Sequence, residues 1–206
     1  PLFSASPVRF EKIVLTDQYL CDGISFGDFN QDGHQDVVAG PYWYEGPDFK
    51  VKHEFYPMEP QPLEEKPTNS LFSFVADFNQ DGWPDILVVG RVMFHQAFWY
   101  ENPRVKDGSA GLWKKHFAAH RIQGESPQIL DIDGDGKPEV LSTWQKQFGW
   151  WRPNWEQPTQ PWTFVPITEV FEHRELYHGE GVGDINGDGL NDLILNEAWW
   201  EQPADK

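Results

Sequence analysis

The sequence has too little cysteine to form an internal disulfide. Its single cysteine, Cys21, has no partner among the 206 residues. The fold must therefore be stabilised by packing, by bound metal or by repetition. Because free cysteines behave as small apolar residues, we interpret Cys21 as a packing residue.

Long apolar runs and helical patterns are also missing. No stretch approaches the ~20 apolar residues that a membrane span requires, so we predict no membrane insertion. No long segment repeats apolar residues at a spacing of three to four, and 17 Pro and 18 Gly interrupt the chain. These absences argue against a helical protein and predict an all-β fold.

Basic residues are scarce. The chain has 16 Lys and Arg against 33 Asp and Glu, which gives a formal charge of −17. This balance argues against nucleic acid or an anionic membrane as the main partner. Many acidic residues recur in short clusters with fixed spacing instead of forming one acidic tail. Cations are therefore the expected counterpart of these clusters.

Aromatic residues, in contrast, are abundant. They make up 16% of the chain and include 11 Trp. This content is too high for a disordered acidic protein and predicts extensive ring packing. The length is sufficient for a large core, so we predict a single domain over residues 1–206.

One nine-residue segment occurs four times. Its pattern is Asp-x-Asx-x-Asp-Gly-x-x-Asp, with Glu as the last residue of one copy. The copies occupy residues 28–36, 77–85, 131–139 and 184–192. They begin 49, 54 and 53 residues apart, a period typical of propeller blades and too long for most helical repeats.

Short β-type segments surround each copy. One precedes the nine-residue loop, an apolar run follows it, and an aromatic segment ending at proline comes next; the first three repeats add a fourth segment. The expected strands are 23–27, 37–39, 42–47 and 51–55; 71–76, 86–89, 98–103 and 113–117; 128–130, 140–141, 149–153 and 162–165; and 181–183, 193–195 and 198–203. Each repeat is thus predicted to be a four-stranded antiparallel sheet, and the chain a β-propeller with four blade repeats.

The two ends of the repeat array are complementary. Residues 8–15 resemble the fourth strand of a blade, whereas the last repeat stops after its third strand. The N-terminal strand is therefore a candidate to complete the last blade, because closure protects sheet edges. The sequence permits a closed four-bladed ring or a piece of a longer propeller.

The loops have the composition of a cage for a hard cation. Oxygen-bearing side chains stand at positions 1, 3, 5 and 9, position 7 offers its backbone carbonyl, and glycine at position 6 permits a sharp turn. The predicted ligands are Asp28, Asn30, Asp32, His34 and Asp36; Asp77, Asn79, Asp81, Trp83 and Asp85; Asp131, Asp133, Asp135, Lys137 and Glu139; and Asp184, Asn186, Asp188, Leu190 and Asp192. We expect up to four structural Ca²⁺ ions, one for each blade.

Two other interpretations of the loops are an EF-hand and a metal-free hairpin turn. An EF-hand needs Glu at position 12, where this chain has Ala39, Val88, Ser142 and Leu195. The second reading, metal-free hairpin turns rich in Asp, Asn and Gly, stays open. Mg²⁺ is less suitable than Ca²⁺ because it demands a stricter octahedron.

The loop resembles the FG-GAP or VCBS repeats of integrin α-subunit propellers and of many bacterial secreted proteins. The matching core is Gly27 to Gly33 with Asp36, and its counterparts end at Asp85, Glu139 and Asp192. The resemblance implies a β-propeller with calcium loops on one face and an extracellular, periplasmic or cell-surface location. The usual ring of that family has more blades than the four repeats found here.

The connections at the opposite face differ among the repeats, and variable loops on a regular scaffold often carry function. We name Arg91, His95, Trp144, Lys146 and His178 as candidate ligand-binding residues. His178, Glu180 and His95 are candidate general bases. The aromatic segments themselves are better explained as packing between blades.

Two functions are consistent with this pattern. The favoured one is a non-catalytic interaction module that binds glycan or protein through the variable face. The alternative is a carbohydrate-active enzyme, because the repeats resemble the propellers of some sugar lyases and dehydratases. Fold alone does not decide between them, and no nucleophile motif, phosphate loop or zinc-type spacing supports catalysis. The sequence does not predict the oligomeric state.

Overall fold

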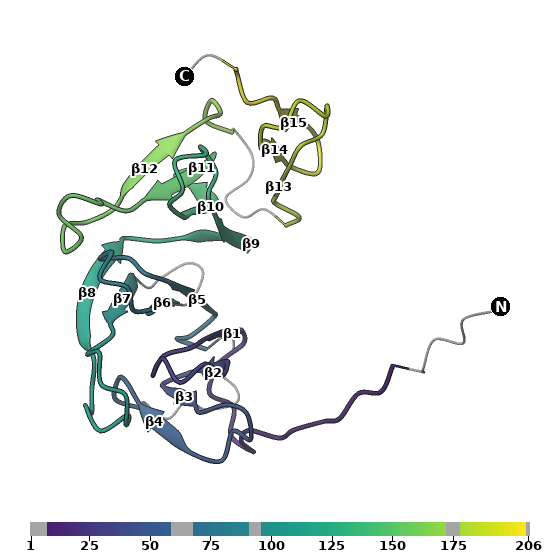
Figure 1. Cartoon of the computed structure of the whole chain (residues 1–206). Coiled ribbons are helices and arrows are strands. Elements are labelled where there is room, and N and C mark those ends of the chain that lie inside the picture. The colour runs from purple at the N-terminus through teal and green to yellow at the C-terminus, as the bar shows by residue number, and fades with distance from the viewer. Residues whose placement is uncertain (1–7, 59–67, 91–95, 172–177, 205–206) are drawn as a thin grey trace.

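A computed structural model of the chain describes residues 8–58, 68–90, 96–171 and 178–204 (Figure 1). Every regular element in these residues is a β-strand. The predicted all-β fold class is therefore confirmed. Within the same residues, no helix is long and apolar enough to cross a membrane.

The strands form four antiparallel sheets that follow one another along the chain. In the first three sheets, each strand pairs with the next in sequence. The strands of the first two sheets are β1 (Ile24–Gly27), β2 (Asp36–Ala39), β3 (Tyr42–Tyr44), β4 (Lys52–Glu54), β5 (Phe72–Ala76), β6 (Asp85–Val89), β7 (Ala97–Glu101) and β8 (Lys114–Ala119). Those of the other two are β9 (Gln123–Leu130), β10 (Glu139–Trp144), β11 (Gln147–Arg152), β12 (Thr163–Pro166), β13 (Gly181–Gly183), β14 (Asp192–Ile194) and β15 (Trp199–Trp200).

The strand predictions agree closely with these bounds. The largest difference is in the third sheet, where β9 begins at Gln123 although the expected strand begins at Gln128. A register shift between Leu141 and Thr143 of β10 lets β9 continue past the point where regular pairing would end. The fourth sheet has three strands in the described part of the chain.

The sheets pack face to face along an arc (Figure 1). The second sheet shows why its strands are apolar on both faces, because it has a neighbour on each side. Ile86 and Val88 of β6 belong to the core shared with the first sheet. Leu87 and Val89 belong to the core shared with the third. Strict alternation along one strand therefore supplies two cores.

The aromatic segments follow the same rule, as predicted for packing between repeats. Trp43 and Trp99 pack in the core on the side of the following sheet. Tyr100 and Trp151, each one position later in the repeat, pack on the side of the preceding sheet. Trp199, the equivalent of Trp99 in the last sheet, is 43% exposed because no further sheet covers it.

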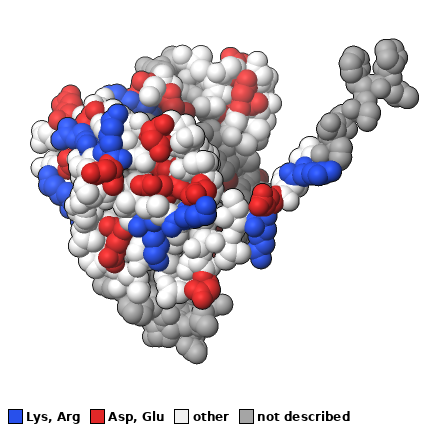
Figure 2. All heavy atoms as spheres, turned by 60° about the horizontal axis from the view of Figure 1, so that its bottom comes forward, with Lys and Arg blue, Asp and Glu red and all other residues white. Residues whose placement is uncertain are grey.

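Residues 8–15 do not complete the last sheet, so that expectation is wrong for this structure. The segment forms no strand and stands clear of the sheets (Figures 1 and 2). Its apolar side chains are exposed, Phe10 to 94%. The edge strand it was expected to join, β15, has two residues and offers few backbone groups for pairing.

Candidate functional site

Each nine-residue loop joins the first strand of its sheet to the second. Position 6 is glycine in all four copies, with φ between 84° and 90°. This left-handed conformation is costly for residues with a Cβ. Position 4 also has positive φ, at 54° in Gln31 and 59° in Gln80. The backbone is thus bent twice, which turns the odd-numbered side chains inward.

The loop oxygens are organised by the same hydrogen bonds in every copy. In the first loop, Asp28 accepts from the amides of Asp32 and Gly33, both at 3.0 Å. Asn30 accepts from the amide of Asp32 at 3.1 Å, and Asp32 accepts from that of His34 at 2.8 Å. The equivalent four bonds occur in the other three loops. The side chains at positions 1, 3 and 5 are therefore held in place by backbone amides.

The carboxylate at position 9 connects the loop to the third strand. Asp36 is fully buried and accepts from the amides of Phe29 at 2.7 Å and Gly46 at 2.9 Å. The corresponding bonds join Asp85 to Phe78 and Asn102, and Asp192 to Ile185 and Gln202. Position 9 thus fixes both ends of the hairpin and uses both of its oxygens in doing so.

The third loop breaks this rule. Oε2 of Glu139 accepts from the amide of Ile132 at 3.0 Å, but Oε1 has no hydrogen-bond partner although the residue is 0% exposed. The cross-strand register pairs Val140 with Trp151. The second amide donor to the carboxylate of Glu139 would therefore be residue 153, two positions beyond Trp151. This residue is Pro153, which has no N–H. An unpaired buried carboxylate oxygen is costly, so this site lacks a positive or donating group.

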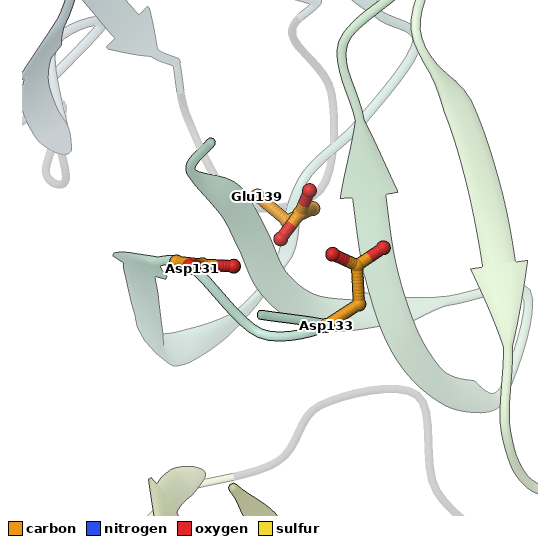
Figure 3. A group of neighbouring side chains, drawn as sticks. All are labelled: Asp131, Asp133 and Glu139. Carbon is orange, nitrogen blue, oxygen red and sulfur yellow. The ribbon is translucent and has the colours of Figure 1, made fainter. Parts of the chain in front are cut away.

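The carboxylate of Glu139 lies beside two further carboxylates. Oxygens of Asp131, Asp133 and Glu139 lie within 4.8 Å of one another (Figure 3). This set fits a hard divalent cation, which takes carboxylate and carbonyl oxygens. Arg152 is already close, with Nη2 3.3 Å from Asp133 and 3.1 Å from Asp135. Its guanidinium partly neutralises the third loop.

Burial makes the carboxylates at position 9 of the first three loops harder to ionise. It raises the pKa of Asp85 to about 8 and that of Glu139 to about 7, and the other carboxylates of each loop add to the rise. The pKa of Asp36 is raised for the same reasons. A cation bound within the loop would favour the ionised forms.

Amide side chains tie the loops to neighbouring repeats. Nε2 of Gln31, in the first loop, donates to the carbonyl of Gly82 in the second loop at 2.6 Å. Nε2 of Gln80 donates to the carbonyl of Trp155 in the third repeat at 3.2 Å. Asn102 and Asn191 donate to carbonyls of preceding loops in the same way. The conformation of one loop is therefore coupled to that of the next.

A groove of about 1200 Å³ is lined by turns at the other ends of the strands and by β7, β8 and the residues just before β8. Its lining comes from the first three sheets. The aromatic and basic side chains that line it are Tyr19, Phe55, Tyr56, Phe98, Tyr100, Trp113, Lys115, His120, Arg121, Trp144 and Lys146. The molecule thus has acidic loops at one end of its strands and an aromatic, basic groove that extends from the other end along β7 and β8.

A family model described as FG-GAP-like repeat matches residues 68–142. This part of the chain is therefore similar to an FG-GAP-like repeat. The match includes the second loop, the third loop and all of the second sheet. FG-GAP-like repeats indicate a repeat-based interaction module. No curated protein matches the chain at a significant level.

The structure brings together part of the predicted ligand-binding set. Trp144 and Lys146 line the groove beside the FG-GAP-like repeats, whereas His178 is not among its lining residues. Arg91 and His95 lie outside the described residues. The sequence-based set is therefore divided between the groove and a separate position.

The candidate general bases lie in different surroundings. The exposed imidazole of His178 lies 3.2 Å from Oε2 of Glu125. Glu180 is 4% exposed, neither of its carboxylate oxygens has a hydrogen-bond partner, and burial raises its pKa to about 8. The side chain of Glu180 packs against Gly124 of β9. One residue is exposed beside Glu125 and the other is buried, so they do not form an acid–base pair.

Sequence reasoning missed most of the groove residues. Phe98 and Tyr100 were assigned with Trp99 to one aromatic segment, but alternate residues of a strand face opposite ways. Lys115 and Arg121 carried no motif. The alternation of β7 was the available signal, because it separates Trp99 from Phe98 and Tyr100.

Proposed function

We propose that the chain is a calcium-stabilised interaction module whose ligand binds in the groove opposite the loops. The observation that carries the calcium part is the unpaired, fully buried Oε1 of Glu139 beside Asp131 and Asp133. The repetition of one hydrogen-bond network in four loops extends the proposal to all of them. Up to four Ca²⁺ ions would be held by the oxygens at positions 1, 3, 5, 7 and 9.

Calcium would act on stability and not on chemistry. Each loop gathers three or more acidic side chains within one short hairpin, and their mutual repulsion opposes the compact form. A bound divalent cation supplies the opposing charge. Because position 9 holds the third strand and the Gln side chains hold the next repeat, tightening one loop also fixes its surroundings.

We further propose that the four sheets are blades of a β-propeller located outside the cytoplasm. The arc of the sheets and their face-to-face packing support blades. The shared period and loop position support the same arrangement. Calcium is abundant outside cells, so loops of this type would be saturated there.

A non-catalytic module is favoured over a sugar lyase or dehydratase. Catalysis by proton abstraction needs a base within hydrogen-bond reach of its substrate. His178 is paired with Glu125 outside the groove, and Glu180 is buried against β9. Trp144 and Lys146, which do line the groove, are suited to stacking and to pairing with anionic groups.

Thermal unfolding with EDTA and with added calcium tests the proposal. We expect the midpoint to fall by several degrees in EDTA and to recover with Ca²⁺ more fully than with Mg²⁺. Titration calorimetry should show one fewer bound calcium in Asp131→Asn. The exposed Asp48, outside all four loops, gives the control Asp48→Asn. A midpoint that does not respond to calcium would contradict the proposal.

A further inference from the structure

The groove differs in charge from the rest of the chain. Among the described residues, 23 line it, and none of them is Asp or Glu. The whole chain has 33 acidic residues in 206, so an evenly mixed lining of this size would contain three or four. The lining instead includes Lys115, Arg121 and Lys146, together with His120. The described part of the groove lining is therefore basic, although the chain as a whole is acidic.

The cations are presented together with aromatic rings. Nζ of Lys115 lies 3.7 Å from the centroid of the Phe98 ring. Tyr56 stacks on Tyr100 with centroids 5.2 Å apart. The rings of Tyr56, Phe98 and Trp144 are partly exposed. Flat, partly exposed rings next to cations suit a ligand that has both apolar ring faces and negative charges.

The turn that carries Lys146 has an unfavourable backbone conformation. Gln145 and Lys146 connect β10 to β11 with φ of 49° and 65°, in a tight turn that favours Asn and Gly. Oε1 of Gln123 accepts from the amide of Gln145 at 3.2 Å, and the amide of Phe171 donates to the carbonyl of Lys146 at 2.8 Å. These contacts hold Trp144 and Lys146 at the groove.

Neutral hydrogen-bonding groups complete the lining. Asn69, Gln96, Gln123 and Gln145 are all among its residues. Side-chain amides both donate and accept, so they match hydroxyl groups, which do the same. The volume of about 1200 Å³ exceeds the usual range for one small molecule. The groove therefore fits a segment of a polymer better than a single metabolite.

We propose that the groove binds a carboxylate-bearing polysaccharide, with sugar rings on Tyr56 and Trp144 and carboxylates paired to Lys115, Arg121 and Lys146. This inference rests on the proposed interaction module and names its ligand class. A polyuronate combines regularly spaced carboxylates, hydroxyl groups and flat pyranose faces. An acidic peptide would satisfy the cations, and its backbone would match the side-chain amides, but it would offer no flat pyranose face to the aromatic rings.

Binding of short galacturonate oligomers, measured by titration calorimetry at low ionic strength, tests the inference. The fully methyl-esterified oligomer keeps the sugar rings and removes the charges. We expect it to bind at least about tenfold more weakly, because charge-assisted hydrogen bonds are lost. Raising the salt concentration should weaken binding of the acidic oligomer alone.

Neighbouring lysines on one strand give a matched pair of variants. Lys115 lines the groove, whereas Lys114 lies on the other face of β8, 3.4 Å from Glu101. Lys115→Gln and Lys146→Gln should each weaken oligogalacturonate binding about tenfold. Lys114→Gln should leave it unchanged. Circular dichroism of each variant checks that the fold is retained.

Four outcomes would overturn the inference. They are equal binding of the esterified oligomer, equal loss in Lys114→Gln, tighter binding of poly-glutamate than of oligogalacturonate, and no binding of any polymer. The calcium-dependent melting is measured on the same samples. If calcium stabilises the chain but no uronate binds, the proposed ligand class is wrong and the calcium proposal is supported. If uronate binds but calcium has no effect on melting, the ligand class is supported and the calcium proposal is wrong.

Discussion

Pro153 stands where the other three repeats provide a backbone amide, and Oε1 of Glu139 is left without a partner as a result. The third loop therefore differs from its three counterparts through a residue fourteen positions away. In the other loops, the ninth carboxylate already has two amide donors. The third loop alone has a buried oxygen that a cation would satisfy outright.

Restoring the missing donor should stabilise the calcium-free protein. In Pro153→Ala, the new amide can donate to Oε1 of Glu139, and we expect a gain of about 1 kcal/mol. Losing proline also gives the unfolded chain more freedom, which opposes this gain. Pro103→Ala, at the position after the donor in the second repeat, measures that cost alone. Urea unfolding in EDTA should place Pro153→Ala above Pro103→Ala, and the opposite order would refute the assignment.

Removing Arg152 should tighten calcium binding at the third loop. Its guanidinium contacts Asp133 and Asp135 and competes with a cation for their oxygens. Half-exposed pairs of this kind contribute up to about 1 kcal/mol, so affinity should rise by up to about fivefold in Arg152→Gln. Calorimetric calcium titration measures the change. Lys50→Gln, which removes a charge paired with Asp48 away from the loops, should have no effect.

The glycine at position 6 should be required for its backbone conformation and not for space. Gly82 has φ of 87°, and a Cβ added there would meet no atom within 4 Å. Gly82→Ala should therefore cost about 1–2 kcal/mol through strain alone. Gly183 of β13 also has open space but no positive φ, so Gly183→Ala should not destabilise. Equal unfolding midpoints for the two variants would contradict this explanation.

Glu180 should make stability depend on pH. Burial raises its pKa from 4.5 to about 8, so the folded state keeps its proton while the unfolded state loses it. Its contribution is most favourable below pH 4.5 and is lost progressively up to about pH 8. Glu180→Gln removes this loss. The difference in free energy of unfolding between Glu180→Gln and wild type should therefore be larger at pH 8 than at pH 5 by on the order of 2–4 kcal/mol.

Urea unfolding in saturating calcium at the two pH values checks this prediction. The other buried carboxylates are present in both proteins, so their effects cancel in the difference. Glu156→Gln, at an exposed position, is the control. A constant difference between wild type and Glu180→Gln across this range would show that Glu180 is ionised in the folded protein.

Much of the fold could be predicted because its signals are local. Position 6 needs glycine, and alternating oxygens need the spacing that the loop supplies, so four loops and the hairpins around them follow from short segments. The strands flanking the loops were predicted within a few residues, except β9. The extension of β9 depends on a register shift in its pairing with β10, and no local sequence pattern predicts that shift.

Other features could not be predicted because they depend on which strands meet. The apolar pattern of residues 8–15 resembles a fourth strand, yet the segment pairs with no sheet in the structure. His178 carried the same sequence signal as Trp144 and Lys146, yet it does not line the groove. A sequence pattern indicates that a segment can form a strand or line a site. Whether it does so depends on the surfaces that it packs against.

By itself, the sequence determined the all-β class, the four loops and their oxygen-rich composition, because each depends on residues close together in the chain. The tertiary structure decided that Pro153 deprives Glu139 of a donor, that Arg152 reaches the third loop, and that basic and aromatic residues from three sheets form one groove. These relationships join residues from different strands and repeats. Cross-strand register and sheet-on-sheet packing bring these residues together, and neither can be predicted from a single segment of the sequence.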